Sequence, residues 1–478
     1  MANVSDNDQI VRKLGDKLKY GQLKDVAYPS HRILNETNQR SGSTFHPQQQ
    51  VEFTFPQDKL NEFVDINDSL RIKWPVTVTA DAYLDRAGAY STWEKLEIYQ
   101  GSQMLTNVNK ENLLICALKD MGQISESYAG STGKNQEGFE KGLLRGEKLL
   151  AGVEREFMMS IHCSDLAMTT PKRDLYLGSK QDITIRITLA HQDISLYTDA
   201  GGASTYSVTE PRLITNNTYM EEVTMKAIDM VVKNQYQMLS GSYEHADFVI
   251  TAGSPSANLK LPFAKKSMER IIFTVRQSST VSNIAKMSLG GRTTGNMIDF
   301  QFKVKGKNVP QSPIRIENDG TEVFWHLLQA DNVSSSQQLG NDLMNAFDVS
   351  TYGPQSTNPE VVSTNPFMKN CLVGENGSYG KGLNATAPEA SDIGKFLGGL
   401  SFESSLVSNN GSPLYSGVNT TSGDMYFNCH FGNAGAGAFV NPTTGIGTNP
   451  QDLTIDFFCL STEYLYYIQE SRAWSDSV

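Results

Sequence analysis

The sequence predicts an all-β protein built from two copies of one domain, with few helices. The first observation is a set of short segments in which apolar and polar residues alternate, such as DITIRITL at 182–189, where Ile183, Ile185 and Ile187 share one face. Alternation with period two is typical of half-buried strands. The second observation is that several such segments recur later in the chain, in the same order. Unrelated segments rarely repeat in order, so the repetition indicates a duplicated domain.

The repeat is clearest around residues 259–277, LKLPFAKKSMERIIFTVRQ, which predict a strand, a turn and a second strand. Pro262 has no N–H to donate to a sheet and should end the first of these strands. A similar pattern occurs earlier, as VEFTFP at 51–56 and LRIKWPVTV at 70–78. In this comparison Pro56 is equivalent to Pro262, so both segments should form equivalent strands.

Three further pairs of segments are similar between the two halves. They are KLEIYQG at 95–101 with FQFKVKG at 300–306, KENLLICALKD at 110–120 with TEVFWHLLQAD at 321–331, and DITIRITL at 182–189 with DMYFNCHF at 424–431. The middle pair has the apolar spacing of a short amphipathic helix. Each copy is therefore expected to carry a helix shortly after a strand that ends in a glycine turn.

These patterns predict a first domain at 46–225, a linker at 226–242 and a second domain at 243–478. The linker is placed where the apolar residues fit a helix and a strand equally. The segment 332–395 is dense in Asn, Ser, Gly and Pro and forms a long insertion in the second domain. The apolar and aromatic segment 453–468 should pair as the last strand of the second sheet.

Residues 1–45 are predicted to form an N-terminal arm. Ile10, Leu14 and Leu18 lie at helical spacing, and Asp6 or Asp8 can cap the helix. The rest of the arm is polar and shows no core strand. The apolar stripe needs a surface to cover it, which is either the arm's own domain or a neighbouring molecule. Ile10, Leu14 and Leu18 are the expected buried contacts.

The composition excludes several classes of protein. A chain of 478 residues exceeds the usual size of one hydrophobic core. A net charge of −11 argues against a protein that coats nucleic acid. No run approaches the ~20 apolar residues that span a bilayer, and the N-terminus lacks the apolar core of a secretory signal. The five cysteines form no CxxC pair, so reduced thiols are expected.

The sequence offers no clear metal, cofactor or catalytic motif. The seven histidines are scattered. The adjacent pairs His162-Cys163 and Cys429-His430 would point to opposite faces of a strand, so neither pair can easily chelate one ion. The segment GSTGK at 130–134 lacks the full spacing of a phosphate-binding loop. Paired acidic catalysts meet in space and not in sequence, so the sequence leaves them open.

Three segments resemble the double jelly-roll major capsid proteins of eukaryotic DNA viruses, a group that includes nucleocytoplasmic large DNA viruses, virophages and polinton-like viruses. They are LEIYQGSQM at 96–104, the strand-rich segment 156–189, and LKLPFAKKSMERIIFTVRQ at 259–277. Two departures mark this chain as a distant member. Lys265 stands where the family has the start of a His-Pro pair, and Phe273 replaces a Trp.

The resemblance implies two tandem eight-stranded jelly-roll β-sandwiches with short helices and long loop insertions. It implies a structural protein, not an enzyme, whose homotrimers form pseudo-hexagonal capsomers of an icosahedral virus shell. The expected partners are neighbouring capsomers, penton and minor capsid proteins and an internal membrane, with no sequence-specific binding of nucleic acid. The protein would be made and assembled inside the host cell and would be located in the virion.

The alternative function is a carbohydrate-binding or carbohydrate-active protein made of two β-sandwiches. Such a protein would be expected to carry a signal peptide and a cluster of exposed tryptophans. The four tryptophans, Trp74, Trp93, Trp325 and Trp474, are widely separated in the sequence. The sequence therefore favours the capsid function.

Overall fold

The structure is a computed structural model. It describes residues 30–40, 42–55, 62–64, 70–85, 87–120, 149–161, 175–176, 182–198, 202–221, 235–284, 288–290, 292, 295, 297–316, 321–330, 396–402, 417–431 and 452–468. The predicted arm helix with Ile10, Leu14 and Leu18 lies outside these residues, as does the insertion 332–395.

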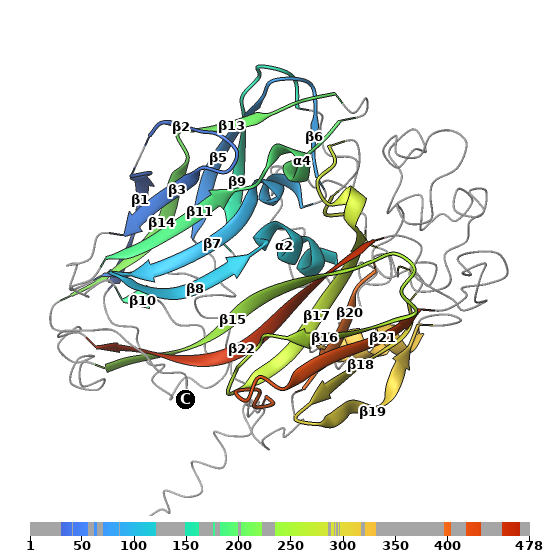
Figure 1. The fold of residues 1–478 in the computed structure, drawn as a ribbon. Coiled ribbons are helices and arrows are strands. Elements are labelled where there is room, and N and C mark those ends of the chain that lie inside the picture. The colour runs from blue at the N-terminus through green and yellow to red at the C-terminus, as the bar shows by residue number, and fades with distance from the viewer. Residues whose placement is uncertain are drawn as a thin grey trace, which may run out of the picture.

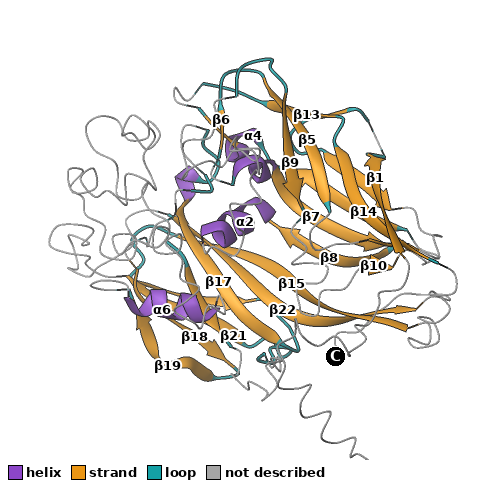
Figure 2. Cartoon of the chain, turned by 180° about the vertical axis from the view of Figure 1, so that it is seen from behind, coloured by secondary structure: helices purple, strands orange, loops and turns teal. Residues whose placement is uncertain are grey.

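The described residues form two β-sandwiches that lie one beside the other, with helix α2 between them (Figure 1, Figure 2). All strand pairs within the sheets are antiparallel. The elements of the first sandwich are β1 (Ser30–Asn38), β2 (Thr44–Phe45), β3 (Gln50–Phe55), β4 (Glu62–Val64), β5 (Arg71–Val78), β6 (Tyr83–Leu84), η2 (Gly88–Thr92), β7 (Trp93–Gln100), β8 (Gln103–Asn109), α2 (Glu111–Asp120), β9 (Arg155–Ser160), β10 (Leu175–Tyr176), β11 (Ile183–Leu189), α4 (Gln192–Ser195), β12 (Leu196–Tyr197), β13 (Tyr206–Thr209) and β14 (Arg212–Met220).

The second sandwich contains fewer and longer elements. These are β15 (Gln235–Ile250), β16 (Ser256–Leu261), β17 (Met268–Gln277), η4 (Ser278–Thr280), β18 (Met297–Val304), β19 (Lys307–Arg315), α6 (Thr321–Ala330), β20 (Gly398–Ser401), β21 (Met425–Phe431) and β22 (Leu453–Ile468). β22 pairs with both β15 and β17, so the prediction that the last strand lies inside the second sheet is confirmed.

The two sandwiches repeat the same strand order. One sheet runs β3-β11-β7-β8 in the first and β16-β21-β18-β19 in the second. The other contains β1, β14, β5 and β9 in the first and β15-β22-β17-β20 in the second. Asp182 and Asp424 immediately precede the equivalent strands β11 and β21, and α2 and α6 follow the equivalent strands β8 and β19. The all-β fold of two eight-stranded jelly rolls is therefore confirmed. Pro56 lies outside the described residues, whereas Pro262 directly follows β16.

Two strands lie where the sequence predicted none. β1 falls within the predicted arm and pairs with β14 along its whole length. It was missed because its side chains alternate between half-buried and exposed, and because it carries only two aliphatic residues, Ile33 and Leu34. β15 begins at Gln235, within the predicted linker, and pairs with β22 from its first residue. The two sheets thus extend beyond the ranges 46–225 and 243–478, which stay predictions as domain limits.

Each sandwich is filled by aromatic side chains. In the first, the rings of Trp74 and Trp93 meet edge to face at 5.6 Å, and the Trp74 indole donates a hydrogen bond to Thr92. In the second, Phe273 of β17 is surrounded by five aromatic rings, those of Phe300, Phe302, Phe396, Phe427 and Phe457. Aromatic side chains bury large apolar areas, and edge-to-face pairs add to the stability of a core.

Candidate functional site: the interface between the jelly rolls

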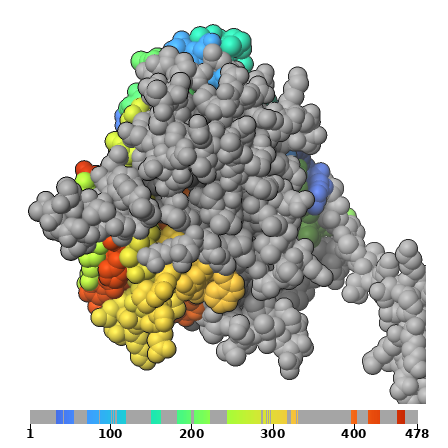
Figure 3. Space-filling view, turned by 90° about the vertical axis from the view of Figure 1, so that its right-hand side faces the viewer, coloured from blue at the N-terminus to red at the C-terminus, as the bar shows by residue number. Residues whose placement is uncertain are grey.

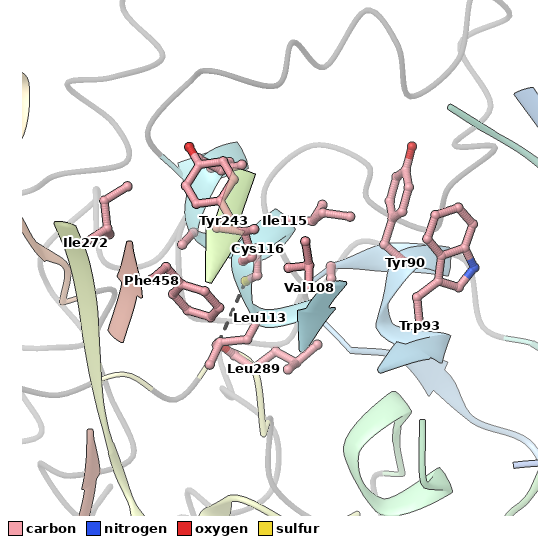
Figure 4. Packing of buried hydrophobic residues seen from close by; sticks show 14 of the residues in the cluster. Tyr90, Trp93, Val108, Leu113, Ile115, Cys116, Tyr243, Ile272, Leu289 and Phe458 are labelled. Atoms are coloured by element: carbon pink, nitrogen blue, oxygen red, sulfur yellow. Dashed lines mark hydrogen bonds between the residues drawn. The ribbon is translucent and has the colours of Figure 1, made fainter. Parts of the chain in front are cut away.

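Helix α2 of the first jelly roll lies against the second. Its side chains are described from Glu111 to Leu118, and all of them are buried. Figure 4 shows Leu113 and Cys116 beside Leu289 and Phe458 of the second jelly roll, and the Cys116 thiol donates a hydrogen bond of 3.7 Å to the Leu289 carbonyl. β8 runs beside β15 in the same interface (Figure 1). The first jelly roll thus covers the outer face of a sheet in the second.

The sheet strand β17 shows the effect of this cover. All ten of its residues are buried. Phe273 points into the aromatic core, so its neighbours Ile272 and Thr274 lie on the outer face, because side chains alternate along a strand. The outer face of β17 is therefore shielded from solvent, by the first jelly roll and by helix α6 of the second.

An ion-pair cluster around Asp456 of β22 lies in this interface. The Asp456 carboxylate is fully buried. It accepts two hydrogen bonds from the Arg276 guanidinium, at 2.6 and 3.1 Å, and His245 Nε2 lies 3.0 Å away. Lys110 of the first jelly roll donates a fourth bond, from Nζ, at 2.9 Å. Lys110 also reaches Asp247 of β15, at 3.3 Å, so one side chain joins the two jelly rolls through two carboxylates.

The electrostatics of the cluster keep Asp456 ionised. Burial alone would raise the pKa of Asp456. The charge of Arg276, the hydrogen bond from His245 and the charge of Lys110 outweigh this effect, so its pKa lies well below the ordinary value. A buried carboxylate held in this way is satisfied only while all its partners are in place.

The turn that presents Lys110 is unusual. Lys110 lies between β8 and α2 and has a φ of 53°, in the left-handed region that glycine adopts most easily. A lysine here carries a strain cost that a glycine would avoid. The ion pairs with Asp456 and Asp247 offset this cost, and a glycine at position 110 would not form them.

A second connection runs through the residues that follow η4. The Leu289 N–H donates to the Asp85 carboxylate at 3.1 Å, and the Thr198 N–H donates to the Ile284 carbonyl at 2.9 Å. The carbonyl of Ser288 accepts from Arg276 at 3.0 Å, which ties this segment back to the ion cluster. The interface thus combines an apolar helix, a buried ion cluster and a hydrogen-bonded loop.

Comparison with solved structures gives the fold a name. No family model matches the sequence, and no curated protein matches it. A chain of the PBCV-1 virus capsid superposes with a TM-score of 0.54 at 9% identity, over 94% of this chain and 97% of that one. The fold is that of the double jelly-roll major capsid proteins. A chain of the Sputnik virophage gives a TM-score of 0.53 at 11% identity, over 97% of this chain and 92% of that one.

A further likeness is to PBCV-1 VP54 as fitted into a reconstruction of the virophage Sputnik. Its TM-score is 0.53 at 9% identity, over 93% of this chain and 97% of VP54. The likeness therefore extends over both jelly rolls and does not depend on one of them alone.

The adjacent His and Cys residues, which the sequence did not favour as a metal site, lie as follows. Cys429 is buried in the second core, whereas His430 is exposed and its Nδ1 lies 2.6 Å from the Asp299 carboxylate. The two side chains point to opposite faces of β21, as the sequence predicted. Burial raises the pKa of the Cys429 thiol to about 12. His162, Cys163 and the segment 130–134 lie outside the described residues.

Three more findings concern only the part of the chain that the structure describes. No group of three or more His, Cys, Asp and Glu side chains is placed to hold a metal ion there. No helix within it is long and apolar enough to cross a membrane. Of its cysteines, Cys116, Cys429 and Cys459 are free and buried.

The Asp456 cluster was missed in the sequence, although a signal was present. Asp456 interrupts the apolar run LTIDFFCL, and Arg276 ends the run IIFTVR. A charged residue inside a strongly apolar strand is rarely buried unless it is paired. Two such residues of opposite charge, on strands expected in one sheet, could have predicted the ion pair.

Proposed function

We propose that the chain is a structural major capsid protein. In this proposal its homotrimers form pseudo-hexagonal capsomers that tile an icosahedral virus shell, and it is located in the virion. The observation that carries the proposal is the likeness to capsid chains over both jelly rolls, with 97% of the PBCV-1 capsid chain covered. A tile needs no catalysis and no cofactor, so we propose no enzymatic activity.

The interface between the jelly rolls supports this function. A flat tile requires its two sandwiches to keep a fixed angle. The buried side chains of α2 from Glu111 to Leu118 and the Asp456 cluster hold that angle with apolar and directional contacts. Three chains, each with two like domains, then place six similar units around one axis, and such a ring packs hexagonally.

The test is the mass of the native particle. A trimer of 52.7 kDa chains has a mass of about 158 kDa. Permanent interfaces commonly bury ~2,000 Å² or more, so the trimer should survive dilution to nanomolar concentration. A monomer in light scattering at micromolar concentration would contradict the proposal.

The carbohydrate-binding alternative has less support. Trp74 and Trp93 are fully buried in the first core, so they have no face for a sugar ring. Trp325 is exposed, and Trp474 lies outside the described residues. No cluster of exposed tryptophans is present in the described part of the chain. We therefore retain the capsid function.

The arm belongs to the same proposal. We propose that Ile10, Leu14 and Leu18 lie beneath the tile and dock on an adjacent capsomer, a minor capsid protein or an internal membrane. Burying three such side chains contributes on the order of 5 kcal/mol at most. The test is deletion of residues 2–28, which spares β1, since β1 starts at Ser30. Trimers should form while capsid assembly fails, and a loss of trimers would contradict this role.

A further inference from the structure

The equivalent helices α2 and α6 differ in burial. Each follows the last strand of a four-stranded sheet, and α2 is buried throughout its described side chains. In α6, by contrast, Glu322, Trp325 and Gln329 are exposed, and Trp325 exposes 54% of its surface. The inner side of α6 packs on β20 and β17, and its Ala330 carbonyl accepts a bond from Arg270. One helix is therefore docked on a neighbouring domain, and its equivalent presents an uncovered aromatic face.

The equivalent sheets differ in the same way. On the outer face of the second sheet, α2 covers Phe458 of β22 and α6 covers Gly399 beside β17, whereas Asp247 and Val249 near the end of β15 are exposed. On the equivalent sheet of the first jelly roll, alternate residues of β1 are exposed, and Leu34 exposes 65% of its surface. Arg71 of β5 is exposed on the same face, beside Lys73, which bonds Glu36 of β1. Within the chain, α2 thus packs on the sheet of the second jelly roll. The equivalent helix α6 and the equivalent sheet of the first jelly roll each have an exposed face.

The exposed face of α6 and the exposed sheet of the first jelly roll cannot meet within one chain. β1 and α6 lie far apart, on opposite sides of the molecule, in Figure 2. In Figure 3 the yellow and orange residues of the second jelly roll, in the range of β18, β19 and α6, reach the surface. The exposed helix and the exposed sheet can therefore meet only between copies.

We propose that the Trp325 face of α6 docks on the outer face of β1, β14 and β5 in a second copy of the chain. This inference rests on the proposed homotrimer and names the contact that would close it. The contact is head to tail, because helix and sheet are different surfaces, and such contacts form rings when the rotation closes. Each chain in a closed ring would then have both helices docked and both sheets covered.

The distribution of charge favours the contact between α6 of one copy and the β1, β14 and β5 sheet of the next. Residues 317–331 contain four acidic side chains and no Lys or Arg, namely Glu317, Asp319, Glu322 and Asp331. The outer face of β1, β14 and β5 carries four cations, Arg32, Arg71, Lys73 and Arg212, and two anions that pair with them, Glu36 with Lys73 and Arg212 and Glu210 with Arg212. The neighbouring strand β9 adds one exposed anion, Glu156, so cations are still in excess. An acidic helix segment therefore meets a basic sheet.

The contact inside the chain has the opposite polarity. There the turn before α2 brings the cation Lys110 to the acids Asp456 and Asp247. An α6 segment would bring acids to that same sheet, where they would face carboxylates. Complementary charge steers encounters and suppresses wrong partners, so the two sheets select different helices.

The first test is covalent capture between copies. We would replace Leu34 and Trp325 by Cys in a full-length chain that also carries Cys163→Ser and Cys371→Ser, since Cys116, Cys429 and Cys459 are buried. A short bismaleimide should give covalent dimers and trimers on a denaturing gel. The matched control pairs Trp325→Cys with Val249→Cys, which is 62% exposed on the other jelly roll, and it should stay monomeric on the gel.

The second test weakens the contact without harming the subunit. Trp325→Ala should raise the trimer dissociation constant by about 30-fold or more, as truncation of an interface Trp commonly does. Leu150→Ala, at a side chain 54% exposed on the first jelly roll, should leave that constant unchanged. Trimers that light scattering detects but that neither cross-link through the first pair nor weaken with Trp325→Ala would overturn this contact and leave the capsid function standing. A wild-type monomer would overturn both.

Discussion

The strands β5 and β17 occupy the same place in the two jelly rolls but have different surroundings. In β5, exposure alternates: Ile72 and Trp74 are buried, while Arg71 is exposed and Lys73 is half-buried. In β17 every residue is buried. The difference does not come from the sandwich itself, because both strands line the same kind of core. It comes from helices α2 and α6, which both pack on the outer face that contains β17, whereas the outer face of β5 is open.

The covered face is not simply a more apolar version of the open one. β17 has Ile272 at an outer position where β5 has Lys73, and it also carries the buried Arg276. Replacing a buried ion pair with apolar residues is often neutral or stabilising, so the pair is weak evidence for stability. The ion pair does, however, require a particular geometry, because Lys110 of the first jelly roll must lie within hydrogen-bond distance of Asp456 in the second. We infer that the Asp456 cluster fixes how the two jelly rolls sit against each other.

The largest expected effect comes from breaking that cluster. Asp456→Asn leaves the buried Arg276 without its carboxylate and leaves Lys110 with Asp247 alone, and removing one partner of a buried pair typically costs about 3–5 kcal/mol. We expect a loss of this size in the free energy of unfolding, measured with urea. The matched control is Glu36→Gln on the open face, which breaks the exposed pairs with Lys73 and Arg212 and should change stability far less. Equal losses would mean that the covered and open faces do not differ in this respect.

A somewhat smaller loss of stability should follow from adding a methyl group where β20 packs closely against β17. Gly398 of β20 lies against the Phe273 ring, and a Cβ added there would overlap that ring. Overpacking of a core commonly costs about 1–3 kcal/mol, so Gly398→Ala should lower the unfolding midpoint. Gly202→Ala is the control, because a Cβ at Gly202 would meet nothing within 4 Å. If both variants were equally stable, the aromatic core around Phe273 would be looser than its packing indicates.

The comparison also separates what the sequence could predict from what it could not. The paired strands and the equivalent helices α2 and α6 were predicted, because a period of two or 3.6 residues is a local property. The strand β1 was not, because an open sheet face allows polar residues such as Arg32 and Glu36. The Asp456 cluster was not, because its four groups come from four separate segments. Nor could sequence tell that α2 is covered and α6 exposed, since both helices carry apolar residues.

On the covered face, pH should act through the buried carboxylate of Asp456. The pKa of Asp456 in the folded state lies below its ordinary value of 3.8, so the unfolded chain takes up the proton first as the pH falls. Its contribution is therefore complete at neutral pH and is lost progressively as the pH falls below about 5. The stability difference between wild type and Asp456→Asn should shrink as the pH falls below about 5. A difference that grew on acidification would contradict an ionised Asp456.

The smallest effect on the subunit, and the sharpest probe of the open face, is Arg71→Glu. Arg71 is exposed at the start of β5, so its reversal should leave the unfolding midpoint of the subunit nearly unchanged. If the acidic segment around α6 approaches this face, re-formation of trimers from dissociated chains should slow by about tenfold at low ionic strength. The slowing should vanish in ~1 M salt, where charges are screened within ~3 Å. Lys260→Glu makes the same change of charge at an exposed position of β16, on the other type of sheet, and should not slow assembly. If both variants slowed assembly equally, net charge would explain the result, and the basic face of the first jelly roll would have no special part in it.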